Sequence, residues 1–108
     1  MKVDINEMIL FFDELTPLLT DVEQKIYWFK SVREDGLIVK LIVSIYESHA
    51  CVIINNKAGI DISSVSMKNC SEIRVLDEKK KCLEILHADG TRRCFLSLLG
   101  DLVLEYTE

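Results

Sequence analysis

The stretch IYWFKSVREDGLIVKLIVSIY, residues 26–46, decides the fold expected for this chain. Its two halves are rich in the β-branched and aromatic residues that strands favour. Between them, Glu34-Asp35-Gly36 is a turn signal of the Asp-Gly type. A helical pattern from Val22 to Val32 can also be drawn, but the composition favours a strand over Ile26–Arg33. The sequence therefore predicts an antiparallel hairpin whose second strand covers Leu37–Tyr46.

Beyond this hairpin, short segments of strand-forming residues alternate with polar turns. The turns are too short for a crossover, so consecutive strands must pair antiparallel as a meander. The apolar residues change parity between Ile62 and Val65, which predicts a β-bulge near Ser63-Ser64. The last segment fits either a strand or a single helical turn. The predicted segments are Cys51–Ile54, Ile60–Val65, Ser71–Leu76, Lys81–His87, Arg92–Leu98 and Leu102–Tyr106.

The start of the chain predicts an amphipathic helix, Asp4–Leu15. Asp4 can cap it, with Glu7 three residues later in the position of a capping-box acid. Apolar residues follow the helical spacing and make one stripe, and Pro17 cannot continue the helix. The expected fold class is therefore α+β, with an N-terminal amphipathic helix packed on a curved antiparallel sheet or half-barrel of six or seven strands in meander order.

Composition predicts a compact protein with one domain, residues 1–108. Hydrophobic residues make up 49% of the chain, which is enough to close a core. The longest apolar runs are far shorter than the ~18–20 residues of a membrane helix, and the amino terminus lacks the pattern of a secretory signal. We therefore expect a cytoplasmic protein without membrane contact, whose four cysteines are reduced and buried.

The net charge of −5 is concentrated in the first quarter of the chain. Residues 1–24 contain six acidic residues and one lysine, whereas residues 25–108 contain twelve charges of each sign. Nucleic-acid-binding proteins draw most of their affinity from clustered Lys and Arg, so this distribution argues against that class. A local excess of negative charge favours association with a basic protein. The alternative is that these acids form only the solvated face of a helix.

Candidate catalytic and metal-binding residues are few. The chain has two histidines, His49 and His87, and four cysteines that form no C-x-x-C pair. A structural zinc site needs four ligands, and a cysteine nucleophile needs a neighbouring base or a helix N-terminus. Acid–base catalysis by the histidines, as in a small ribonuclease, needs an RNA substrate that an acidic protein repels. The sequence therefore predicts no metal, no cofactor and no enzymatic activity.

Three consecutive aromatic residues, Tyr27-Trp28-Phe29, bear on recognition. Side chains alternate along a strand, so the three cannot all face one core. Either both faces of the sheet are covered, one of them by the N-terminal helix, or one aromatic ring is displayed outward. Core packing is favoured, but Tyr27 or Trp28 is also a candidate apolar anchor, because Tyr and Trp often anchor protein interfaces.

The chain resembles the small immunity proteins of bacterial polymorphic toxin systems, including those of contact-dependent growth inhibition. The likeness rests on the short acidic helix Asp4–Leu15, the strand pair YWFKSV (27–32) and LIVKL (37–41), and the later strand IRVL (73–76). It implies a cytoplasmic monomer that binds one cognate toxin tightly, in a heterodimeric complex, and blocks its active site. Nuclease toxins of this kind are commonly basic, which an acidic surface fits.

These observations lead to one functional hypothesis and two alternatives. The hypothesis is a non-enzymatic protein that neutralises a cognate basic toxin domain, a nuclease, by occluding its active site with carboxylates in the positions of substrate phosphates. The alternatives are an acidic secretion chaperone or adaptor, and a small hydrolase or ribonuclease that uses Cys or His. The predicted partner-binding residues are Glu7, Asp13, Glu14, Asp21, Glu23, Tyr27 and Trp28.

Overall fold

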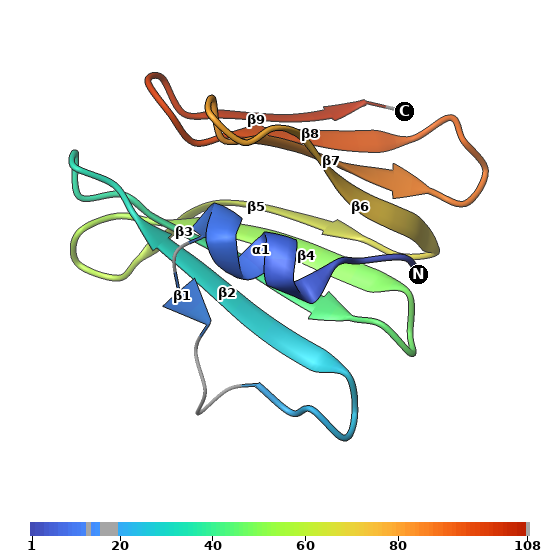
Figure 1. Cartoon of the computed structure of the whole chain (residues 1–108). Coiled ribbons are helices and arrows are strands. Elements are labelled where there is room, and N and C mark those ends of the chain that lie inside the picture. Colours follow the sequence, from blue (N-terminus) through green and yellow to red (C-terminus); the bar gives the residue numbers. More distant parts are fainter. Residues whose placement is uncertain (13, 16–19, 108) are drawn as a thin grey trace.

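In residues 1–12, 14–15 and 20–107, which the computed structural model describes, the chain forms two antiparallel β-sheets and one short helix (Figure 1). The five-stranded sheet has the order β1-β2-β3-β4-β5, and the four-stranded sheet has the order β6-β7-β8-β9. The elements are α1 (Ile5–Phe12), β1 (Glu14–Leu15), β2 (Ile26–Val32), β3 (Ile38–Ser44), β4 (His49–Asn55), β5 (Asp61–Met67), β6 (Cys70–Asp77), β7 (Cys82–His87), β8 (Arg93–Ser97) and β9 (Val103–Thr107).

The α+β character, the N-terminal helix and the sequential antiparallel pairing are confirmed. The prediction of one curved sheet or half-barrel of six or seven strands is wrong, because the nine strands of the described residues divide into sheets of five and four. The division falls at Lys68-Asn69. There Asn69 has a left-handed backbone (φ 55°) and the chain passes from β5 into β6 without pairing the two strands. The final segment is a strand, β9, and not a helical turn.

The helix α1 is shorter than predicted. It begins after Asp4, whose carboxylate accepts the backbone N–H of Glu7 at 3.1 Å, as the capping pattern indicates. It ends at Phe12 instead of Leu15, which lies in β1 opposite Phe29 of β2. Pairing with the edge of β2 satisfies backbone groups that a longer helix would satisfy internally.

The two sheets and α1 share one hydrophobic core. Figure 1 shows the sheets stacked one above the other, with α1 lying between them on the side that faces the viewer. Met8, Phe11 and Phe12 project from the helix into this core and are at most 3% exposed. Phe12 stacks on Phe29 of β2, with the ring centroids 5.8 Å apart. The helix therefore closes one side of the sandwich.

Lys81, in the turn before β7, links the end of α1 to the four-stranded sheet through hydrogen bonds. Its ammonium group donates to the backbone carbonyl oxygens of Leu10 and Phe11, at 3.1 and 2.9 Å. It also lies 5.7 Å from the centre of the Phe11 ring. A cation at this end of a helix is favourable, because the last carbonyl groups carry partial negative charge.

The predicted bulge in β5 is present. Ile54 pairs with Ser63 and Asn55 pairs with Asp61, so Ile62 is an extra residue on the β5 side. The bulge thus lies next to the predicted Ser63-Ser64 position. It explains the change of parity in the apolar pattern, because residues on either side of an inserted residue face opposite ways.

The turns of the sandwich end on residues with left-handed backbones. In the β2–β3 turn, the backbone N–H of Gly36 (φ 88°) donates to Arg33 O at 3.0 Å. The β3–β4 turn has the same arrangement, but Ser48 (φ 52°) takes the left-handed position and donates to Ile45 O at 3.2 Å. Glycine adopts this conformation freely, whereas a residue with a Cβ atom is strained in it.

Exchanging the residue type at these two turns should change stability in opposite directions. Ser48→Gly should raise the free energy of unfolding by about 0.5 kcal/mol, because relief of backbone strain outweighs the added freedom of the unfolded chain. Gly36→Ala should lower it by about 1–2 kcal/mol. A methyl group there would also clash with the Lys57 side chain, which would have to move aside. Urea titrations measure both, and a loss of stability in Ser48→Gly would contradict the strain argument.

Candidate partner-binding surface

Three of the predicted acidic residues lie along one edge of the five-stranded sheet. Glu14 of β1 is opposite Lys30 of β2, and Asp21 forms a two-way backbone bridge with Ile26 at the start of the same strand. Glu23 lies in the turn that follows Asp21. We call Glu14, Asp21 and Glu23 the acidic edge.

The remaining predicted acids are placed differently. Glu7 is half-buried on α1, which packs against β1 and β2. Asp13 lies outside the described residues. The predicted acidic set therefore does not form one continuous patch in the described part of the chain, and the acidic edge comprises its members that lie beside β2.

The carboxylates of the acidic edge are exposed and available. Asp21 accepts the backbone N–H of Gln24 at 3.1 Å and so caps its turn. Within residues 1–12, 14–15 and 20–107, none of the ion pairs involves Glu14, Asp21 or Glu23. Lys30 lies opposite Glu14 in the register without forming an ion pair with it, and no other described cation pairs with this edge.

The two aromatic candidates face opposite ways. Tyr27 is 8% exposed and stacks against Phe29, with centroids 6.3 Å apart, so it belongs to the core. Trp28 points to the outer face of the sheet, where it is partly exposed and pairs in register with Ile42. Only Trp28 is therefore in a position to contact a partner without unfolding.

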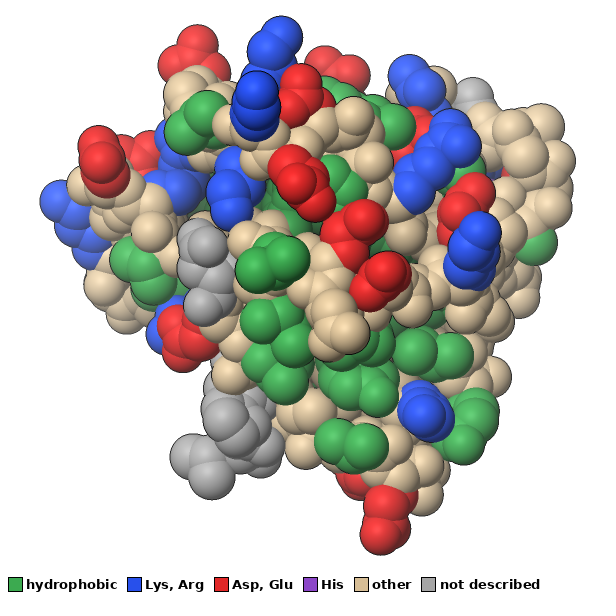
Figure 2. Space-filling model, viewed as in Figure 1, with side chains coloured by type: hydrophobic (Ala, Val, Ile, Leu, Met, Phe, Trp, Pro, Cys, Tyr) green, Lys and Arg blue, Asp and Glu red, His purple; other side chains and the backbone are tan. Residues whose placement is uncertain are grey.

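The outer face around Trp28 is mixed, because the neighbouring row on the same face carries Lys30 and Lys40. The row across the strands runs from Trp28 to Ile42, Cys51 and Ser66. Figure 2 shows the side of the molecule on which α1 lies, where hydrophobic side chains gather near the centre and acidic side chains lie above them. Trp28 lies on the opposite face of β2, because Phe29, its neighbour along the strand, packs on Phe12 of α1.

The outer face of the four-stranded sheet is built differently and centres on Glu84 of β7. Its side chain is 3% exposed, and it forms ion pairs with Arg74 of β6 and Arg93 of β8. Sequence reasoning missed this buried carboxylate. A signal was present, because Glu84 lies on the outward parity of its strand and is opposite Arg74 in the register. Because Glu84 and the two arginines pair with one another, we assign this network a role in holding the four-stranded sheet together.

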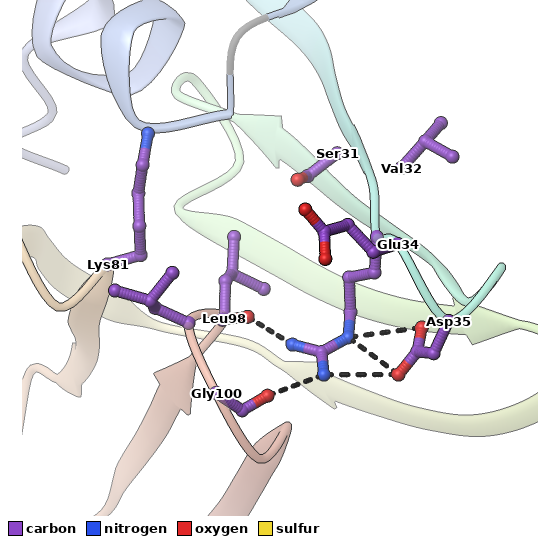
Figure 3. Close-up of a pocket in the computed structure, with 9 residues that line it drawn as sticks. Ser31, Val32, Glu34, Asp35, Lys81, Leu98 and Gly100 are labelled. Atoms are coloured by element: carbon purple, nitrogen blue, oxygen red, sulfur yellow. Dashed lines mark hydrogen bonds and ion pairs between the residues drawn. The ribbon is translucent and has the colours of Figure 1, made fainter.

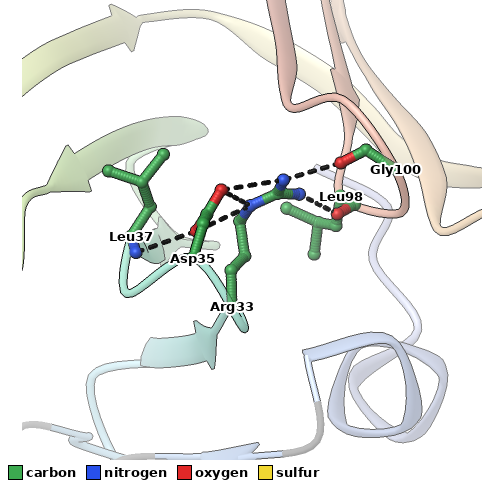
Figure 4. A network of polar contacts seen from close by, with 5 residues as sticks. All are labelled: Arg33, Asp35, Leu37, Leu98 and Gly100. Atoms are coloured by element: carbon green, nitrogen blue, oxygen red, sulfur yellow. Dashed lines mark hydrogen bonds and ion pairs between the residues drawn. The ribbon is translucent and has the colours of Figure 1, made fainter.

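A pocket of about 700 Å³ opens at the end of the sandwich, between the β2–β3 and β8–β9 turns (Figure 3). Arg33 crosses between these turns. Its guanidinium donates to the backbone oxygens of Leu98 and Gly100, the latter at 2.6 Å, and to Asp35 at 3.1 Å (Figure 4). The hydrogen bonds from Arg33 and from the backbone N–H of Leu37 hold the pKa of Asp35 below its ordinary value. Sequence reasoning did not predict this link, because it joins residues 65 and 67 positions apart.

Three of the four cysteine thiols are poorly suited to act as nucleophiles. Burial raises the pKa of the thiols of Cys51 and Cys70, and it raises that of Cys94 to about 11, so thiolate is scarce at neutral pH. His49 Nε2 lies 2.7 Å from the hydroxyl of Ser66, and His87 Nδ1 lies 3.0 Å from the backbone nitrogen of Asp89. The described residues include no group of three His, Cys, Asp or Glu side chains that could hold a metal ion.

Comparison with known proteins adds no relative: no family model, no curated protein and no solved structure matches this chain. Among the described residues, no helix has the length and apolar character needed to cross a bilayer.

Removing the Arg33 link should weaken the contact between the sheets. Arg33→Met should lower the free energy of unfolding by about 2 kcal/mol, because it removes charge-assisted hydrogen bonds to two backbone carbonyl groups. It should also raise the pKa of Asp35 toward its ordinary value, which an NMR titration measures. The matched control is Arg92→Met, since Arg92 is exposed and should change stability by less than about 0.5 kcal/mol. Equal effects of the two substitutions would show that Arg33 does not join the sheets.

Proposed function

We propose that this protein is a non-enzymatic inhibitor that binds a cognate basic toxin domain, a nuclease, in the cytoplasm and occludes its active site. The observation that carries the proposal is the acidic edge: exposed carboxylates of Glu14, Asp21 and Glu23 that form no ion pair with the described residues. Exposed charge of one sign speeds association with a partner of the opposite sign.

The carboxylates of the acidic edge are complementary in charge to the active site of a nuclease. A nuclease active site is lined by cations that bind substrate phosphates, and carboxylates can occupy the same positions. Pairing of β1 with β2 holds Glu14, and Asp21 is held by its backbone bridge to Ile26 and by its cap on the N–H of Gln24. Trp28, on the same strand, supplies an apolar contact beside them.

The buried thiols favour inhibition over hydrolysis by a cysteine nucleophile. The pKa of three thiols is raised by burial, which disfavours the nucleophilic thiolate. An inhibitor needs no such group, because it acts by occupying the partner's site.

The first test is protection. The protein is co-expressed with the toxin domain encoded beside its own gene, and growth and nuclease activity are measured. Growth should continue, and the purified complex should lack nuclease activity. Growth arrest despite co-expression would reject the proposal. A stable complex whose nuclease remains active would reject inhibition and favour the chaperone alternative.

The second test locates the surface. Glu14→Lys with Glu23→Lys should slow association with that toxin domain about tenfold or more at low salt, and the difference should shrink at high salt. The matched control is Glu78→Lys with Glu105→Lys, which makes the same change in net charge on the four-stranded sheet and should have a much smaller effect. Equal slowing by the two double variants would exclude the acidic edge as the binding surface.

A further inference from the structure

The two faces of the five-stranded sheet differ in what covers them. α1 and the four-stranded sheet lie on one face, where Phe29 stacks on Phe12 (Figure 1). The other face of β2, β3 and β4 is the outer face, and none of the described helices and strands covers it. Alternation along the strands assigns twelve residues to it: Ile26, Trp28, Lys30, Val32, Ile38, Lys40, Ile42, Ser44, His49, Cys51, Ile53 and Asn55.

Seven of these twelve residues are apolar. An antiparallel sheet with one solvated face alternates apolar and polar residues along its strands. In β3 the run from Ile38 to Val43 is instead apolar except for Lys40, so apolar side chains stand on both faces of the strand. This composition is typical of a strand that is covered on both sides. The outer face therefore has the character of a surface that another protein covers.

The acidic edge borders this same face. Glu14 lies opposite Lys30, and Asp21 forms its bridge with Ile26. Residues that are directly opposite in an antiparallel pair project to the same side of the sheet. The side chains of Glu14 and Asp21 therefore project to the side of Trp28, away from α1. The acidic edge and the outer face form one continuous surface.

The centre of the outer face is cationic. Lys30 and Lys40 are opposite each other in the register, and like charges in this position are unfavourable. Lys40 has isoleucines before and after it on the same face of β3, and it lies opposite Ile53 of β4. Within residues 1–12, 14–15 and 20–107, neither lysine forms an ion pair.

Carboxylates occur only at the borders of this surface. On one side is the acidic edge, and on the other is Asp61 of β5, whose carboxylate accepts a hydrogen bond from the side chain of Asn55. None of the twelve residues of the outer face is acidic. The two lysines are therefore complementary to a carboxylate that a partner supplies, and the apolar residues around them would exclude water from that pair.

We propose that the partner docks across this continuous surface, from the acidic edge to Ile53. It sets basic side chains against Glu14 and Asp21. Beyond them, an apolar strip of the partner covers Trp28 and Ile42, and a carboxylate reaches the two lysines. This order of charges fixes how the partner is oriented on the sheet. That the partner is the toxin domain rests on the proposed function.

The first test is Lys40→Glu, measured as the affinity for the toxin domain encoded beside this gene. If Lys40 pairs with a partner carboxylate, the reversal should weaken binding about tenfold or more. If a basic surface of the toxin covered Lys40, the same variant would bind more tightly. The matched control is Lys79→Glu, the same change in charge in the exposed β6–β7 turn, which should alter the affinity by less than about twofold. Unchanged or tighter binding of Lys40→Glu would overturn the proposal.

The second test is Ile42→Ala, which should weaken binding about fivefold through loss of the apolar contact. The matched control is Leu86→Ala, which shortens a half-buried side chain on the outer face of the four-stranded sheet and should leave the affinity unchanged. Urea titrations establish that both variants fold. Equal affinities of the two variants would remove the apolar strip from the interface and overturn the proposal.

The two levels of inference fail in different ways. If the unmodified chain does not bind the toxin domain, the proposed function and this docking mode are both rejected. If Glu14→Lys with Glu23→Lys weakens binding while Lys40→Glu and Ile42→Ala do not, the proposed function stands and only the docking mode is rejected.

Discussion

Burial of the apolar face of α1 between the two sheets is the constraint on which the rest of the structure depends. Met8, Phe11 and Phe12 are almost wholly removed from water, and Phe12 rests on Phe29. Each such side chain contributes about 1.5–3 kcal/mol of hydrophobic stabilisation. Shortly after the helix the chain enters β1, which carries Glu14 and pairs with the edge of β2. It also places the carbonyl groups that Lys81 binds, beside the pocket.

Local patterns were enough to predict most elements, and long-range contacts account for what they missed. Capping at Asp4, the hairpin around Gly36 and the bulge near Ser63 are properties of neighbouring residues, so the sequence reveals them. The split into two sheets is different, because a two-residue turn at Lys68-Asn69 looks the same whether the next strand pairs with β5 or leaves it. The alternation of apolar and polar residues along a strand indicates which face of the strand is buried, but it does not indicate which other sheet covers that face.

The candidate site likewise has features that the sequence reveals and features that depend on long-range contacts. The excess of acidic residues near the amino terminus is visible in the sequence, and the structure adds that Glu14, Asp21 and Glu23 share an edge while Glu7 lies on the helix. The pocket has no sequence signature, because its walls come from turns more than sixty positions apart.

The strictly sequential pairing of the strands has a consequence for how the chain acquires its structure. Within each sheet, every strand pairs with its neighbour along the chain, so these contacts span short loops that close at low entropic cost. The contacts that span long loops are those between the sheets, such as Arg33 with Gly100, and those of the amino-terminal segment with β6, such as Lys2 with Ser71. We therefore expect the hairpins to form early in folding and the docking of the two preformed sheets around α1 to be the slow step.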